Sequence, residues 1–275
     1  MRYSHHLISP WLILLFILSC GGSDSGAREN LREARNAFEK GNYNLAKLKI
    51  DSIKILYPKA FDEIDAGFKL MQEIRMTENR RNIIYCDSML RVNYIALSKL
   101  LNDFDYVRDS RYQEFGEYYP KTYPLHSSLE RNGLRSGVQE RGGLFIESVL
   151  SDHSIQHNRI RVTAADGSYA ESGRVTADGF NYRFSTLHKN YEIVRFTGSD
   201  EIGVAAYIHA YSDQPLTLHF IGNRTVNTAL SDAAKKGISR SFELSTLLLD
   251  IEHLKFEKER SEVLIRYLES RTDSD

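Results

Sequence analysis

Cysteine, tryptophan and proline are scarce in this chain, which has two, one and five of them in 275 residues. A disulfide framework of the kind that holds small secreted domains together needs more than two cysteines. With 41% hydrophobic residues, the chain has the composition of an ordinary globular protein, and its length allows one or two domains.

The chain also lacks an excess of charge of either sign. It has 36 basic and 37 acidic residues, a formal net charge of -1, and no strongly basic block. Because nucleic-acid binding depends on neutralising phosphates with clustered Lys and Arg, it has no electrostatic support here. We expect no nucleic-acid partner.

Motifs that carry catalysis or nucleotide binding are absent. The sequence contains no HExxH, GxSxG, SxxK, Walker loop, GxGxxG, CxxC or calcium-loop pattern. We therefore expect a binding or structural protein with no cofactor, and not an enzyme. A hydrolase whose catalytic residues form no recognisable motif stays open as an alternative.

The most apolar run of the sequence is short and lies near its start, from Trp11 to Leu18. It follows Arg2 and precedes small residues, which is the layout of a secretory signal. A membrane-spanning helix needs about 20 apolar residues, so a permanent transmembrane anchor is not expected. The alternatives are an ordinary cleaved signal and an uncleaved helix.

The residues that end this run, Ile17-Leu18-Ser19-Cys20, resemble the lipobox of bacterial lipoproteins. The resemblance implies removal of residues 1–19 as a signal peptide and attachment of lipid to Cys20, with several acyl chains holding the protein on the bilayer. Residues 20–27 then predict a lipidated, flexible tether. Position 21 is Gly and not Asp, which resembles the pattern of lipoproteins that many Gram-negative bacteria send on to the outer membrane. With Cys20 acylated, an intramolecular disulfide to Cys86 is excluded, and Cys86 is predicted to be an inert core thiol.

Residues 28–105 predict a helical region. Apolar residues recur at helical spacing up to Phe38 and again from Leu45 to Leu56. This helical hairpin resembles one tetratricopeptide unit, and the matching residues are Ala34, Gly41, Tyr43, Ala46 and Pro58. No second copy follows. A long helical stretch extends instead from Ala60 to about Leu101, and Thr77–Asn82 is either a solvated turn of one helix or a break between two.

Residues 227–275 predict a second helical region, with an apolar stripe between Ser241 and Ser270. We expect this helix to pack antiparallel on the helix that contains Cys86. The predicted contact joins Leu247, Leu248, Ile251 and Leu254 to Met89, Leu90, Tyr94 and Leu97.

Between the helical regions, residues 143–226 predict an antiparallel β domain, either a single sheet or a small sandwich. The expected strands are apolar or alternating segments separated by turn signals. They lie at 142–149, 159–164, 181–187, 191–196, 203–212 and 216–222. The fold class is therefore α+β, with the β domain inserted between a helical N-terminal region and a C-terminal helix.

Residues 106–142 predict an irregular, aromatic-rich connection. It contains five candidate ligand-binding rings: Tyr112, Phe115, Tyr118, Tyr119 and Tyr123. Aromatic faces on a loop can stack on sugar rings or hold a peptide. The favoured alternative is that they cover the joint between helices and sheet, because a long ordered loop must bury something.

Other polar groups are weaker candidates. His209 and His219 would lie opposite each other if 212–215 were a hairpin turn, as two metal ligands require, but no third ligand is evident. The acidic group Asp62, Glu63 and Asp65 is predicted to be a solvated helix face. Asp51-Ser52-Ile53 and Asp87-Ser88-Met89 resemble acceptors of a bacterial O-glycosylation system, within predicted helices.

Together these features predict a lipid-anchored lipoprotein of the cell envelope, at the outer membrane, that acts as a protein-binding or scaffold module. Its expected partners are the lipid bilayer, through Cys20, and another envelope protein. The first alternative is capture of a glycan or small ligand by the aromatic segment 112–123, and the second is the hydrolase.

Overall fold

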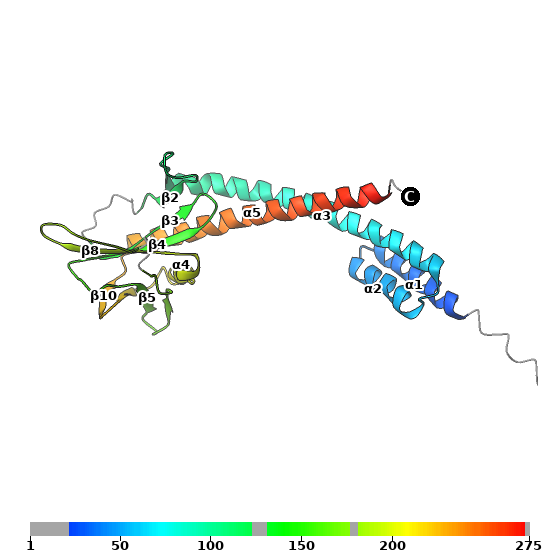
Figure 1. Ribbon diagram of the computed structural model, residues 1–275, viewed down its shortest axis with the longest axis horizontal. Helices are drawn as coiled ribbons and strands as arrows, with labels where there is room; N and C mark the ends of the chain where they lie inside the picture. Colours follow the sequence, from blue (N-terminus) through cyan, green and yellow to red (C-terminus); the bar gives the residue numbers. More distant parts are fainter. Residues whose placement is uncertain (1–21, 123–130, 177–180, 273–275) are drawn as a thin grey trace, which may run out of the picture. The chain divides into compact units, whose positions relative to one another are not determined.

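The computed structural model describes residues 22–122, 131–176 and 181–272 (Figure 1). The chain divides into two compact units. Unit 1 comprises the described residues up to Tyr85 and those from Glu257 onward, and unit 2 comprises those between Cys86 and Phe256. Two long helices, α3 (Phe61–Leu100) and α5 (Asp232–Thr272), contribute residues to both units.

Unit 1 contains the predicted helical hairpin. Helix α1 (Gly22–Glu39) and helix α2 (Tyr43–Leu56) are joined by a turn in which Gly41 has a φ of +73°, a value that favours glycine. The side chain of Asn42 caps α2 by accepting from the backbone N–H of Leu45. Close packing of the hairpin against α3 is possible because Ala34 and Ala46 are fully buried. The small residues on which the tetratricopeptide resemblance rests therefore lie in a helix interface.

The predicted flexible tether is wrong for its described part, because residues 22–27 belong to α1. Ala27 is fully buried and packs with Ile53 of α2 and with Ala60, just before α3. Packing against two neighbouring segments thus extends the helix to Gly22, although the local sequence is rich in glycine and serine. Cys20 and the lipobox lie outside the described residues.

The long central helix is continuous. Residues 77–82 are a turn of α3 and not a break. Helix α5 packs on α3, which confirms the predicted pairing. In unit 2, Leu97 and Leu100 of α3 lie against Leu244 and Leu248 of α5. In unit 1, Asn82 donates a hydrogen bond to Ser261 over 2.9 Å.

Unit 2 is built on two antiparallel sheets. The six-stranded sheet has the order β1 (Phe104–Val107), β2 (Glu117–Pro120), β3 (Gly133–Gln139), β4 (Leu144–Ser151), β8 (Asn190–Thr197), β7 (Asn181–Ser185). The four-stranded sheet has the order β10 (Thr225–Ala229), β9 (Leu216–Ile221), β5 (Arg159–Ala164), β6 (Tyr169–Glu171). The prediction of an α+β fold with an inserted antiparallel β domain is confirmed.

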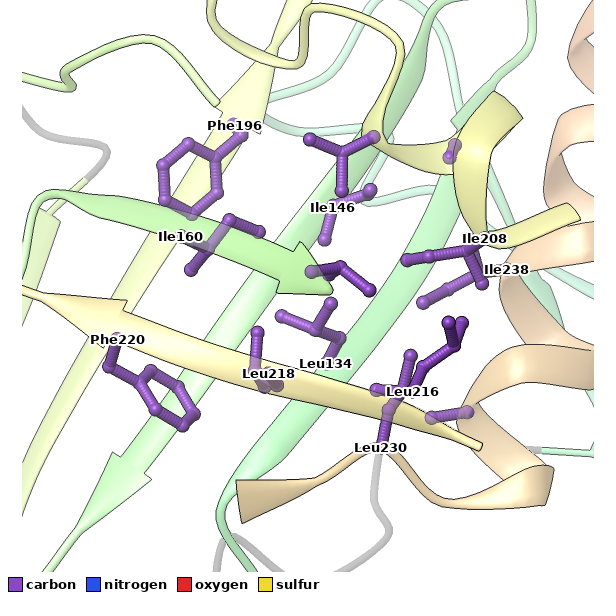
Figure 2. Close-up of a cluster of buried hydrophobic side chains, with 14 of the residues drawn as sticks. Leu134, Ile146, Ile160, Phe196, Ile208, Leu216, Leu218, Phe220, Leu230 and Ile238 are labelled. Atoms are coloured by element: carbon purple, nitrogen blue, oxygen red, sulfur yellow. The ribbon is translucent and has the colours of Figure 1, made fainter. Parts of the chain in front are cut away.

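The main core of unit 2 lies where side chains from both sheets and two helices meet (Figure 2). Ile146 and Phe196 come from the six-stranded sheet, and Ile160 and Phe220 from the four-stranded sheet. Helix α4 (Val204–Ala210) and the first turns of α5 complete this core. Removing these side chains from water is the main stabilising contribution to unit 2, at about 25 cal/mol per Å² of apolar area.

Two predictions about unit 2 are wrong. Residues 203–212, predicted as a strand, contain helix α4, which buries Val204, Ala205 and Ile208 and follows Gly203, whose φ is +76°. The short apolar run is compatible with both the strand period of about two residues and the helix period of about 3.6 residues, and its packing on the core favours the helix. Residues 106–142, predicted to be irregular, contain β2, β3 and the end of β1. Short 3₁₀ turns at Leu101–Asp103 and Gly198–Asp200 complete the elements. None of the described helices is both long enough and apolar enough to span a membrane.

Candidate functional site

The aromatic segment is divided between core and surface. Tyr119 is buried on β2, and its ring edge faces Phe145 with 5.7 Å between centroids. Tyr118 packs beside the cluster of Leu244 and Leu248, where helices and sheet meet. Tyr118 thus lies at the joint between helices and sheet, whereas Tyr119 is buried on the other face of the sheet, beside Phe145.

The remaining rings of this segment do not join them. Tyr112 is 83% exposed, and Phe115 lies beneath the guanidinium of Arg141, 3.9 Å from its ring centre. Tyr123 lies outside the described residues. Beside Phe115 is a hollow of about 280 Å³, lined by Gln113, Glu114, Phe115, Gly116, Glu117, Gln139 and Arg141. This hollow, with one aromatic ring beside polar side chains, is the part of the segment that could hold a small ligand.

The predicted histidine pair does not form. His209 lies on helix α4, whereas His219 lies on β9, so the hairpin that would have placed them opposite each other does not exist. Both ring nitrogens of His219 are engaged, with Thr163 at 3.1 Å and Asn227 at 2.8 Å. Within the described part of the chain, no three His, Cys, Asp or Glu side chains are grouped as metal ligands.

The acidic and serine-containing patterns of the helices lie on surfaces. Asp65 pairs with Lys69 over 2.9 Å, and Glu63 pairs with Arg28 over 3.7 Å, as expected of a solvated helix face. Ser52 donates to the carbonyl of Leu48 within α2, and Ser88 is exposed on α3. Cys86 is buried, in agreement with its predicted place in the core.

A Ser–His–Glu arrangement that sequence reasoning missed lies inside unit 2. The hydroxyl of Ser148 on β4 lies 2.7 Å from Nε2 of His157, and Nδ1 of His157 lies 2.7 Å from Oε2 of Glu192 on β8. These distances are those of a nucleophile, base and orienting acid. No local motif could have revealed the arrangement, because the three residues come from β4, β8 and the loop between β4 and β5.

Burial argues against a catalytic role for this arrangement. Ser148 and His157 are fully buried and Glu192 is 2% exposed, so a substrate has no path to the hydroxyl. Ser148 points from the same face of β4 as Ile146, toward the core between the sheets. We therefore interpret the arrangement as structural.

Glu192 binds the backbone of the loop between β4 and β5. Its Oε1 accepts from the backbone N–H groups of Ile155 at 3.0 Å and Gln156 at 2.7 Å, and its Oε2 accepts from both the backbone and the ring of His157. Gln156 has a φ of +54° and Asp152 a φ of +62°, conformations that need outside support in residues other than glycine. Burial alone would raise the pKa of Glu192, but the hydrogen bonds from His157 and Gln156 outweigh it and lower the pKa to about 2.

A second charged network lies on the opposite face of the six-stranded sheet. Glu147 bonds to Arg135 at 2.5 Å and to Arg195 at 2.8 Å, and Arg195 also bonds to Glu117 at 2.8 Å. Burial by itself lowers the pKa of Arg195, yet Glu147 and Glu117 raise it overall. Burial, followed by the bond to Glu117, raises the pKa of Tyr119. The charges of the two carboxylates and the two guanidiniums neutralise one another. Their hydrogen bonds connect strands β2, β3, β4 and β8.

The most distinctive surface of unit 1 is the outward face of α2. The helix buries Ala46, Ile50 and Ile53 on one side. Its other side carries exposed apolar residues at positions i, i+3 and i+10, which are Leu45, Leu48 and Ile55. Leu48 is 61% exposed and Ile55 is 74% exposed. A helix that is apolar on two opposite faces is typical of the middle layer of a helical stack.

No known protein family, curated protein or solved structure matches the chain. Its two units and the surfaces described above are therefore the basis on which a function can be assigned.

Proposed function

We propose that this chain is a lipid-anchored protein of the bacterial envelope, at the outer membrane, and that it acts as a protein-binding module through the outward face of α2. Anchoring rests on the lipobox resemblance at Cys20. Binding rests on one observation, the second apolar face of α2 formed by Leu45, Leu48 and Ile55. Exposed apolar groups of this kind mark interaction sites on soluble proteins.

The chemistry of this face favours a helix from another envelope protein. Large apolar side chains spaced three and seven residues apart fit the ridges of a second helix. Of the four charged residues of α2, Lys47 pairs with Glu78 over 2.8 Å and Lys49 pairs with Glu33, whereas Asp51 and Lys54 are exposed. The stripe itself contains no charged residue, so we expect apolar contact to contribute most to the partner's affinity.

Charge substitutions on α2 test this proposal. Leu48→Glu and Ile55→Glu should each abolish a specific cross-link between this protein and its partner in intact envelopes, identified by mass spectrometry. Lys54→Glu is the control, because Lys54 is exposed on α2 outside the stripe and also receives a negative charge. Since all three positions are exposed, each variant should keep the helical circular dichroism of the parent. Equal cross-linking in all three variants would contradict the proposed binding face.

Ligand capture is the second proposed function, and the hollow beside Phe115 supports it. Gln113, Gln139 and Arg141 offer hydrogen-bond donors next to one aromatic ring, as a sugar-binding surface requires. It ranks below protein binding because Tyr118 and Tyr119 turn toward the interior and leave Phe115 as the ring in this hollow. The hydrolase ranks lower still, because Ser148 cannot be reached from solvent.

A further inference from the structure

The hairpin formed by β7 and β8 ends in an apolar side chain that the described residues of unit 2 leave exposed. Leu187 is 97% exposed at its tip. The turn is well defined, because the backbone N–H of Thr186 donates to the carbonyl of Lys189 over 2.8 Å and Ser185 donates to the side chain of Asn190 over 2.7 Å. Leucine is a poor turn residue, whereas Gly, Asn, Asp, Ser and Pro are favoured. The fold thus holds a leucine in water at a position where a polar residue would be the ordinary choice.

Aromatic rings lie directly behind the tip. Phe184 on β7 faces Tyr191 on β8, and their rings stack with 5.0 Å between centroids and 18° between planes. Tyr182 is the next residue on the same face of β7 and is 53% exposed. Figure 1 shows the hairpin as a free end of unit 2. Along the hairpin, the order is therefore an aliphatic tip followed by aromatic rings.

The end of the hairpin carries basic groups but no acidic residue. Residues 185–191 include His188 and Lys189 and no Asp or Glu. Lys189 lies 3.5 Å from Asp152, which is outside the hairpin and more than half exposed. Arg183 is bound within unit 2, because it donates to the carbonyl of His157 over 3.3 Å and lies 3.9 Å from Glu192 of β8. The hairpin therefore presents Lys189 beside an apolar tip, which is complementary to a surface with anionic headgroups over hydrocarbon.

We propose that the tip of the β7–β8 hairpin inserts into an anionic lipid surface, with Leu187 in the hydrocarbon, the Phe184–Tyr191 pair at the headgroup level, and Lys189 near the lipid phosphates. This inference rests on the lipid anchoring in the proposed function, which keeps the bilayer at a high effective concentration around the protein. One leucine at a narrow tip is a weak contact by itself, so the two attachments act together.

A single tryptophan at the tip tests this inference in the full chain. Trp11 is the one tryptophan of the sequence, so Trp11→Phe combined with Leu187→Trp leaves a unique fluorophore at the hairpin. The protein is reconstituted in vesicles of phosphatidylethanolamine and phosphatidylglycerol, with or without brominated acyl chains, which quench nearby tryptophan. Leu249→Trp in the same Trp11→Phe background is the matched control, because Leu249 of unit 2 is 53% exposed and lies on α5.

We expect brominated lipid to quench the fluorescence of the Leu187→Trp variant at least twofold more than that of the Leu249→Trp variant, and replacing phosphatidylglycerol by phosphatidylcholine to reduce this difference. Equal quenching of the two variants, or no quenching of Leu187→Trp while the protein floats with the vesicles, would overturn the inference and leave the anchor intact. Flotation that is lost with Leu187→Asp alone would support the hairpin contact and count against the lipid anchor. If the unsubstituted chain does not float, both proposals fail.

Discussion

Replacing Glu192 by glutamine should lower the free energy of unfolding of unit 2 by about 3 kcal/mol at pH 7. Each carboxylate oxygen accepts two hydrogen bonds, so a glutamine, with one carbonyl oxygen, leaves two of the four donors without an acceptor. An unsatisfied buried donor costs about 1–3 kcal/mol. The pKa leads to a similar figure, because lowering it from 4.5 to about 2 corresponds to about 3 kcal/mol.

The stability that Glu192 contributes should decrease as the pH falls. The pKa of Glu192 is lowered in the folded state, so its contribution is fully present above about pH 4.5 and is lost as the pH falls toward 2. The stability difference between the parent and Glu192→Gln should therefore shrink over this range. Near pH 2 the protonated carboxyl and the amide are nearly equivalent, and the difference should approach zero.

Urea unfolding followed by far-UV circular dichroism at pH 7, 4.5, 3.5 and 2.5 measures this difference. Glu171→Gln is the control, because Glu171 also has two charged partners, Arg159 and Arg161, but its side chain is 20% exposed. We expect the control to lose about 1 kcal/mol or less. A loss below about 1 kcal/mol for Glu192→Gln, or a difference that does not change with pH, would refute the role assigned to this carboxylate.

Three further predictions concern the core and the anchor. Ile251→Asp should destabilise unit 2 by several kcal/mol in urea unfolding, because it places an unpaired charge at a position 2% exposed, whereas Leu249→Asp, on an exposed side of the same helix, should change little. Ser148→Ala should cost about 1–3 kcal/mol by removing the hydroxyl beside Nε2 of His157 and should leave cross-linking to the partner unchanged. Cys20→Ala should release the protein from the membrane fraction after a high-salt wash, and a variant that still sediments with membranes would contradict the lipoprotein interpretation.

Much of the fold is predictable from the sequence because its longest elements have unambiguous periods. The stripe from Leu244 to Leu268 recurs every three or four residues over many turns, and a helix is the conformation that buries it. Strand β5 matches its predicted range, 159–164, because polar and apolar residues alternate there and turn-forming residues follow the segment. Helix α4 is missed because its seven residues are too few to separate the two periods, and tertiary packing determines the outcome.

The sequence predicts the site residues less accurately than the fold, because the burial and the partners of each side chain depend on residues far away in sequence. An aromatic-rich stretch does not show which rings become buried. Tyr119 of β2 is buried because its ring meets Phe145 of β4 across Gly137 of the intervening strand β3, which leaves room for the phenylalanine. Similarly, Ser148 and Glu192 are brought together by sheet pairing between β4 and β8. The prediction for Cys20 rests on residues 17–20 alone and lies outside the described residues, so it stays a prediction.

The division of unit 1 into two stretches of chain has a consequence for the order of folding. Residues 257–272 complete this unit, with Ser261 bonded to Asn82 and Glu269 paired with Arg80, yet they are synthesised after all of unit 2. Unit 2 is one uninterrupted stretch and can close its core as soon as its own residues are available. The hairpin of α1 and α2 can pack on α3 at once, but the face of α3 that Ser261 and Glu269 contact must wait while roughly 170 intervening residues emerge and fold. During that interval unit 1 is the part of the chain most dependent on protection from premature contacts.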